Sequence, residues 1–415
     1  MRISLLSPVR KAAFLSGCIT AAVLAWALCW QALAESLLAR TASVEGFERA
    51  ARIQPLNAHY PQVLGTARLQ TNFLEAASLL EESASINPHA SRTWLSLSQT
   101  YGVLGDREKQ HAAILNALAA DPKDINVDWD ASIFLIQNGD VDGGLKLVRD
   151  VINNDPSKVA QAMQTAYRAT GGDIDRTIQA IPATARARLN FLRWLVEHDL
   201  APAADRVWPS VVSVEGKLQA RDLFFYMDSL IYRGEVAKAN VVWTTLKSND
   251  PEVQRRSEPG NLVVNGDFED NLLNGGFDWH YARTDGVTVT MDTSTFHAGT
   301  RALNLQFDAD SIADAGVYEL IPVEPVSRYK LRGYMHSEEL ESANGVRLAV
   351  ADYYAGSVLS SAEEILGSTS WREVTADFAT GPDTRLVKIS VVRSPSYGRI
   401  RGKLWVDDLV MEKRP

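Results

Sequence analysis

Histidines and carboxylates are the side chains of this chain that could do hydrolytic chemistry, but their spacing matches no catalytic motif. No two of the seven histidines form an HxH or HExxH pair, so the usual ligand sets of zinc hydrolases are missing. The sequence has no Gly-x-Ser-x-Gly elbow and no Gly-x4-Gly-Lys-Ser/Thr phosphate loop. The acidic pairs Glu338-Glu339 and Glu363-Glu364 are adjacent, so neither can flank a sugar across the roughly 5–10 Å that a glycosidase requires. We therefore predict that the protein is not an enzyme.

Composition and charge narrow the kind of protein and the kinds of partner further. The chain has 415 residues, of which 46% are apolar and 22% charged, the balance of a globular protein with two or three domains. Its net charge of −9 at pH 7 argues against a nucleic-acid partner, because such a partner needs a basic face. The two cysteines, Cys18 and Cys29, lie in one apolar N-terminal stretch, so the rest of the chain can form no disulfide and offers no thiol nucleophile.

The N-terminus predicts export from the cytoplasm. A basic segment, residues 1–11, precedes an uncharged segment, residues 12–34. As a helix the second segment would extend about 34 Å, enough to cross a hydrocarbon core of about 30 Å. Because positive flanks stay in the cytoplasm, we predict a single-pass anchor with the body of the protein on the other side of the membrane. The alternative is a signal peptide cleaved after Ala34, which would release a soluble exported protein.

A repeat runs through the first half of the chain. Pro55, Pro88, Pro122 and Pro156 follow one another at intervals of 33, 34 and 34 residues. In the block that ends at Pro122, two sets of apolar residues at helical spacing flank a glycine turn: Trp94, Leu97, Tyr101, Gly105, Ile114 and Ala117. This pattern resembles the tetratricopeptide (TPR) family of paired helices.

The repeat predicts an α-solenoid over residues 35–251, with degenerate units over 157–219. Each helix pair has an apolar face that only its neighbours can cover, so stacking supplies the core, and we expect tryptophans such as Trp94 and Trp243 to pack inside it. The concave surface of such a solenoid is a place for a protein partner. Residues 252–258 are predicted to be a linker.

After residue 258 the pattern changes to short strands. Polar and apolar residues alternate over several segments separated by Gly, Asp, Asn and Ser: 287–290, 302–307, 329–334, 346–350 and 386–391. We predict an antiparallel β-sandwich of the jelly-roll type over residues 259–415. The fold class is thus multidomain α + β: a transmembrane helix, a TPR-type α-solenoid and a C-terminal β-sandwich.

Motifs in this half resemble the carbohydrate-binding modules of the CenC-like jelly-roll class. In order, they are Asn265-Gly266-Asp267-Phe268-Glu269, Phe277-Asp278-Trp279, Gly299-Thr300-Arg301-Ala302-Leu303, Trp371-Arg372-Glu373-Val374 and Trp405-Val406-Asp407-Asp408. The whole arrangement is also similar to TPR proteins of the Gram-negative envelope that are associated with exopolysaccharide or O-antigen assembly. That likeness implies a bacterial inner-membrane location with the body in the periplasm.

The resemblance also implies a metal site. In that class the first and last strands are neighbours, so Glu269 and Asp407 would share a structural calcium ion, which prefers oxygen ligands. The alternative is that Asp407 and Asp408 cap a strand or bind backbone amides.

For a sugar site, the candidates are aromatic rings with polar neighbours. Tyr281 and Trp279 follow the turn Gly275-Gly276, and Tyr353 and Tyr354 follow a strand whose alternation stops there. Arg283 and Asp352 would supply polar contacts. Trp279 matches a position that packs inside many sandwiches of this class, so the tyrosines are the better candidates.

These features predict a non-catalytic envelope scaffold, whose solenoid binds a protein and whose sandwich binds a glycan. The alternative is a pure assembly factor whose sandwich is structural and binds no sugar. The sequence identifies neither the glycan nor the protein partner, nor the oligomeric state.

Overall fold

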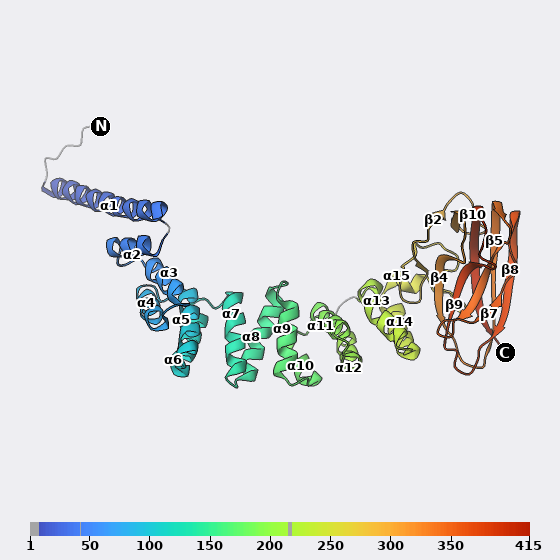
Figure 1. The fold of residues 1–415 in the computed structure, drawn as a ribbon, viewed down its shortest axis with the longest axis horizontal. Helices are drawn as coiled ribbons and strands as arrows, with labels where there is room; N and C mark the ends of the chain where they lie inside the picture. Colours follow the sequence, from blue (N-terminus) through green and yellow to red (C-terminus); the bar gives the residue numbers. More distant parts are fainter. Residues whose placement is uncertain (1–7, 42, 215–217) are drawn as a thin grey trace, which may run out of the picture. The chain divides into compact units, whose positions relative to one another are not determined.

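A computed structural model describes residues 8–41, 43–214 and 218–415 of the chain (Figure 1). Residues 1–7 of the predicted basic segment lie outside these described residues. The chain divides into two compact units, Met1–Pro182 and Ala183–Pro415, which we call unit 1 and unit 2.

Unit 1 is helical throughout its described part. Its helices are α1 (Pro8–Thr41), α2 (Val44–Ile53), α3 (His59–Arg68), α4 (Phe73–Ile86), α5 (Ser91–Leu104), α6 (Arg107–Ala120), α7 (Ile125–Gln137), α8 (Val141–Asn154), α9 (Val159–Ala169) and α10 (Ile174–Ala180). The four repeated prolines each lie two residues beyond the end of a helix, α2, α4, α6 and α8, because proline cannot continue one.

The predicted helix pair before Pro122 is confirmed. Leu97 of α5 and Ala117 of α6 are buried. Between the two helices Gly105 adopts a left-handed φ of 76°, which a residue without a Cβ takes at little cost. Asp106 then caps α6, its carboxylate accepting a hydrogen bond from the Lys109 amide at 3.1 Å. Local sequence therefore sets both ends of the turn.

Helix α1 contains the predicted anchor. Its segment Lys11–Ser36 is apolar and long enough to cross a membrane, the one such segment among the described residues. A signal sequence near an N-terminus would have the same length and composition. The segment supports a membrane span and an export signal alike.

The described part of unit 2 combines five helices with ten strands. The helices are α11 (Ala185–Glu197), α12 (Ala201–Val212), α13 (Ala220–Tyr232), α14 (Val236–Asn249) and α15 (Pro251–Arg255). The strands are β1 (His280–Tyr281), β2 (Val287–Asp292), β3 (Ala302–Ala309), β4 (Asp314–Pro322), β5 (Arg328–Ser342), β6 (Val346–Asp352), β7 (Val358–Ser361), β8 (Gly367–Ala379), β9 (Leu386–Arg393) and β10 (Ile400–Arg414). Residues 252–255 of the predicted linker are helical, because Asp250 caps α15 and Pro251 occupies its first turn.

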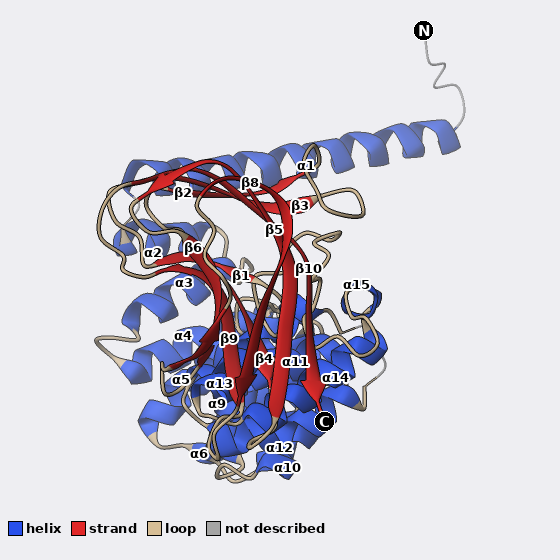
Figure 2. Ribbon diagram, turned by 90° about the vertical axis from the view of Figure 1, so that its right-hand side faces the viewer, coloured by secondary structure: helices blue, strands red, loops and turns tan. Residues whose placement is uncertain are grey.

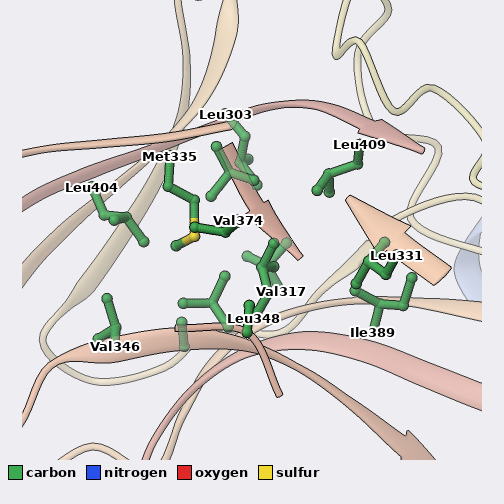
Figure 3. Packing of buried hydrophobic residues seen from close by; sticks show 14 of the residues in the cluster. Leu303, Val317, Leu331, Met335, Val346, Leu348, Val374, Ile389, Leu404 and Leu409 are labelled. Carbon is green, nitrogen blue, oxygen red and sulfur yellow. The ribbon is translucent and has the colours of Figure 1, made fainter. Parts of the chain in front are cut away.

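The strands, red in Figure 2, form the predicted sandwich of two antiparallel sheets. Sheet 1 has the order β1-β4-β9-β6-β7 and sheet 2 the order β2-β3-β10-β5-β8. Side chains from both sheets point toward one another in the core (Figure 3). Those labelled there from sheet 1 are Val317, Val346, Leu348 and Ile389, and those from sheet 2 are Leu303, Leu331, Met335, Val374, Leu404 and Leu409.

Candidate functional site

The three predicted tyrosines reach the surface of the sandwich. The exposed fractions are 50% for Tyr281, 39% for Tyr353 and 45% for Tyr354. The rings of Tyr353 and Tyr354 meet edge to face, with centroids 5.1 Å apart. A ring that is partly exposed and held by a neighbour is suited to stack on a flat ligand face.

Strand pairing separates Tyr281 from the other two tyrosines. Tyr281 pairs with Val317, whose side chain lies in the core, while His280 pairs with Tyr318. Since neighbouring residues of a strand point to opposite faces, His280 and Tyr318 lie on the outer face of sheet 1 and Tyr281 on the inner side of its edge strand. Arg283 is exposed beyond the end of β1. The structure therefore does not place Tyr281 in one face with Tyr353.

Three residues of the outer face were missed by the sequence analysis. The rings of His280 and Tyr318 stack with centroids 4.9 Å apart. The Lys388 ammonium lies 4.8 Å from the Tyr318 centroid and 2.6 Å from a carboxylate oxygen of Asp314. Burial raises the pKa of Tyr318, and the nearby charge of Tyr353 adds to the rise. These contacts depend on the register of three strands, β1, β4 and β9, which no local sequence pattern shows. The period-2 alternation of β4 could, however, have predicted that Tyr318 points outward.

Asp352 holds the turn that carries the two tyrosines. Its side chain is buried, and one carboxylate oxygen accepts from the amides of Tyr354 at 3.0 Å and Ala355 at 2.9 Å. The other oxygen accepts from the Thr384 hydroxyl at 2.5 Å. Burial alone would raise the pKa of Asp352, but these hydrogen bonds lower it. Asp352 therefore positions the turn, and its contact with sugar stays a prediction.

Trp279 belongs to the core. It is 1% exposed, and its ring centroid lies 5.2 Å from that of Phe268. A side chain this enclosed cannot stack on a ligand. The alternative noted from the resemblance, that Trp279 packs inside the sandwich, is the one that the structure shows.

Helices α13 and α14 pack directly on the sandwich within unit 2. A Cβ added at Gly275 would lie 2.3 Å from the Phe224 ring, and one at Gly276 would lie 2.7 Å from Trp243. The Trp243 ring meets that of Phe277 edge to face, with centroids 6.0 Å apart. The glycine pair that predicted a turn is thus also required by the close approach of two aromatic rings.

The carboxylates predicted to share calcium already have protein donors. Asp407 is buried and accepts from the amides of His297, Ala298 and Asp408. Glu269 accepts from the Thr300 amide and hydroxyl and from the Arg301 amide. N–H and O–H groups that point at these oxygens occupy the directions a cation would need, and no group of three or more His, Cys, Asp or Glu suited to a metal occurs among the described residues. The donor set therefore fits amide binding and does not fit calcium.

We accordingly expect calcium to leave the stability of the sandwich unchanged. An ion that binds the folded state alone raises its melting temperature by mass action. Melting curves of the full chain with calcium and with a chelator should coincide, because an ion that does not bind shifts no equilibrium. A clear rise in the melting temperature with calcium would instead support the shared site at Glu269 and Asp407.

A second group of rings lies on the outer face of sheet 2. His297 stacks on Tyr334 with centroids 3.6 Å apart, and His336 lies 5.5 Å from Trp371 and 4.9 Å from Trp405. The Trp405 indole donates a hydrogen bond to Asp292 at 2.8 Å. The rings of this second group come from three strands and from the loop before β3. Only the folded structure brings them together, so the sequence could not show the group. It provides a comparison for the rings of sheet 1.

One protein family and several solved structures match parts of this chain. Residues 260–396 match the family CBM_4_9, described as a carbohydrate binding domain. No curated protein matches the chain. Among solved structures, the chain is similar to the crystal structure of MamA protein, with 12% identity over 37% of this chain and 86% of that one, and a TM-score of 0.31.

Two further solved structures are similar to this chain. One is TmCBM61 in complex with beta-1,4-galactotriose, with 21% identity over 37% of this chain and 99% of that one, and a TM-score of 0.28. The other is pilF of Pseudomonas aeruginosa, with 15% identity over 47% of this chain and 92% of that one, and a TM-score of 0.26.

Proposed function

We propose that the protein is a non-catalytic adaptor whose sandwich binds a glycan and whose helical repeats bind a protein. The observation that carries the proposal is the carbohydrate-binding family match over residues 260–396, together with the exposed rings of Tyr353 and Tyr354 in that segment. Sugars have apolar C–H faces and a rim of hydroxyl groups, and rings beside polar side chains complement both. A protein partner is proposed for the repeats because stacked helix pairs present an extended surface for binding.

The location we propose is the bacterial inner membrane, with Lys11–Ser36 as the anchor and the body in the periplasm, in a role in exopolysaccharide or O-antigen assembly. Alkaline phosphatase fused to the C-terminus should be active, because this enzyme matures only after export. Active cytoplasmic fluorescent fusions beside inactive phosphatase fusions would contradict the proposal. A mature protein that begins at Glu35 would show a cleaved signal peptide and an exported soluble protein.

Removing the Tyr353 ring should weaken glycan binding. An aromatic side chain at the centre of a contact often contributes enough that its truncation costs about tenfold in affinity. We expect Tyr353→Ala to lose about tenfold in binding to envelope polysaccharide of the host, measured by affinity electrophoresis of the full chain. A detergent without a sugar head group keeps the micelle from competing for the site.

Two variants control this experiment. Tyr354→Phe keeps the ring and removes only the hydroxyl, which donates to the Ile231 carbonyl at 2.6 Å, so its loss of affinity should be smaller than that of Tyr353→Ala and measures what this hydrogen bond contributes. Trp371→Ala removes a ring from the outer face of sheet 2 and should also leave binding unchanged. If Trp371→Ala abolishes binding and Tyr353→Ala does not, the glycan site lies on sheet 2.

The packing of α13 and α14 on the sandwich favours a second candidate, a pure assembly factor. Leu320 of β4 has its side chain on the same face as Tyr318 and yet is buried, because α14 contacts this strand. In this candidate the sandwich only extends the helical repeats. It would replace the first proposal if a well-folded wild-type chain binds no polysaccharide of its host.

A further inference from the structure

Helix α13 presents one side to the sandwich. Phe224, Asp228 and Ile231 recur at helical spacing, so they lie on the same side of the helix. The Phe224 ring closes on Gly275, and the Ile231 carbonyl accepts the hydrogen bond from Tyr354. These two contacts fix the helix against the sandwich on either side of Asp228.

Asp228 is an accessible carboxylate on this side of the helix. Its side chain is exposed, and within the described part of the chain it makes no hydrogen bond and no ion pair. Its charge nevertheless acts on the stacked pair of sheet 1: it helps to raise the pKa of Tyr318 and opposes the lowering of the pKa of His280 by burial. The surrounding protein displaces water and raises the pKa of Asp228 itself, although His280 lowers it. A partly dehydrated acceptor beside aromatic rings is suited to hydrogen bonds from ligand hydroxyl groups.

No described lysine or arginine forms an ion pair with Asp228, and the group that lowers its pKa is His280. Lys388, the cation over the Tyr318 ring, is paired with Asp314 at 2.6 Å. Burial lowers the pKa of His280 and so favours its neutral form. Arg283 is exposed beyond the end of β1 and makes no hydrogen bond with another described residue. A ligand carboxylate placed beside Asp228 would therefore be repelled.

We propose that helix α13 forms part of the glycan site, that Asp228 accepts hydrogen bonds from sugar hydroxyls beside Tyr318 and Tyr353, and that the site selects neutral glycans over glycans that carry carboxylates. This inference rests on the proposed glycan-binding function and adds a ligand class to it. It also gives the contact between helices and sandwich a role in recognition, since the site then needs residues from both.

The test is an array that presents each uronic-acid glycan beside its carboxyl-reduced neutral form, probed with the full chain in a detergent without a sugar head group. The wild type should bind the neutral member of each pair about tenfold more tightly. Asp228→Asn keeps the shape and removes the charge, so it should gain about tenfold for the acidic member and keep its affinity for the neutral one. Asp228→Ala should lose about tenfold for the neutral member, because the acceptor is gone.

Asp222→Asn is the matched control, because it removes an exposed carboxylate from the same helix. It should change neither affinity. If both Asp228 variants bind as the wild type does while Tyr353→Ala loses affinity, helix α13 takes no part in the site and the glycan-binding proposal survives. If the wild type binds acidic members at least as well as neutral ones, the proposed selectivity is wrong. If it binds no glycan at all, this inference fails together with the proposed function.

Discussion

Replacing Arg256 with alanine is expected to destabilise unit 2 by about 3–5 kcal/mol at pH 7. The Arg256 side chain is 2% exposed and its guanidinium lies 3.2 Å from a carboxylate oxygen of Asp278, which is fully buried. The same guanidinium donates to the Asn271 carbonyl at 2.6 Å and to Glu252 at 2.9 Å. Without it, the Asp278 carboxylate would be a buried charge with no cation beside it.

The free energy of unfolding that Arg256→Ala loses should depend on pH. Burial raises the pKa of Asp278 to about 6 from its ordinary value of 3.8, although the charge of Arg256 opposes the rise. The folded chain therefore holds this proton more tightly than the unfolded chain, and the resulting stability is complete below about pH 4 and is lost as the pH rises through about 6. Removing Arg256 raises the pKa of Asp278 further. At pH 5 the carboxyl group then stays neutral, and the cost of the substitution should be smaller than at pH 7.

Hydrogen exchange of sandwich peptides at increasing urea, at pH 5 and pH 7, measures the effect within unit 2. Arg255→Ala is the matched control: this neighbouring arginine is 57% exposed in its pair with Asp270, so its loss should leave the free energy of unfolding nearly unchanged. Asp278→Asn added to Arg256→Ala should recover part of the loss. Equal stability of Arg256→Ala and the wild type at pH 7 would show that the buried pair contributes nothing.

Replacing Trp279 with alanine should cost a similar amount, about 3–5 kcal/mol, because it leaves a cavity in the core of the sandwich. Trp279→Phe should cost clearly less than Trp279→Ala, since a ring still fills most of the space and the cavity is smaller. The Trp279 indole N–H is buried and has no hydrogen-bond partner among the described residues, so its removal offsets part of that cost.

Tyr281→Ala is the control for Trp279→Ala. The two residues are close in sequence, but Tyr281 is half exposed, so its loss should barely change the melting temperature. Trp279→Phe should also keep full glycan affinity. If Trp279→Phe loses glycan binding but keeps its stability, Trp279 contacts the glycan after all.

Local sequence patterns were enough to predict which parts of the chain form helix pairs, which form strands and which could cross a membrane. The proline period and the helical spacing around Trp94 and Gly105 depend only on interactions within a turn or between adjacent helices, so the helix pairs could be read from the sequence. Alternation over segments such as 386–391 predicted strands for the same reason, because a residue's place on a strand face repeats every two positions. The apolar segment 12–34 needed only its length and lack of charge.

The candidate site depended on contacts between distant residues, and the sequence could not supply these. His280 and Tyr281 are neighbours of similar polarity, and only the pairing of β1 with β4 decides which of them joins Tyr318 on the outer face. Asp352 precedes two tyrosines, which predicts a contact with sugar, but no local pattern shows its hydrogen bonds to Thr384 and to the turn amides.

Helix α13 shows most clearly what local sequence determines and what only packing between distant elements decides. Phe224 and Phe225 are identical residues side by side, yet Phe224 closes on Gly275 of the sandwich and Phe225 lies under the guanidinium of Arg193, 4.1 Å away. Helical spacing alone determined that the two rings point in different directions. Which ring meets the sandwich, and hence that Asp228 lies beside sheet 1, was decided by packing between elements far apart in the chain, where the free energy of burial depends on the shape and partner of each face and not on its local sequence.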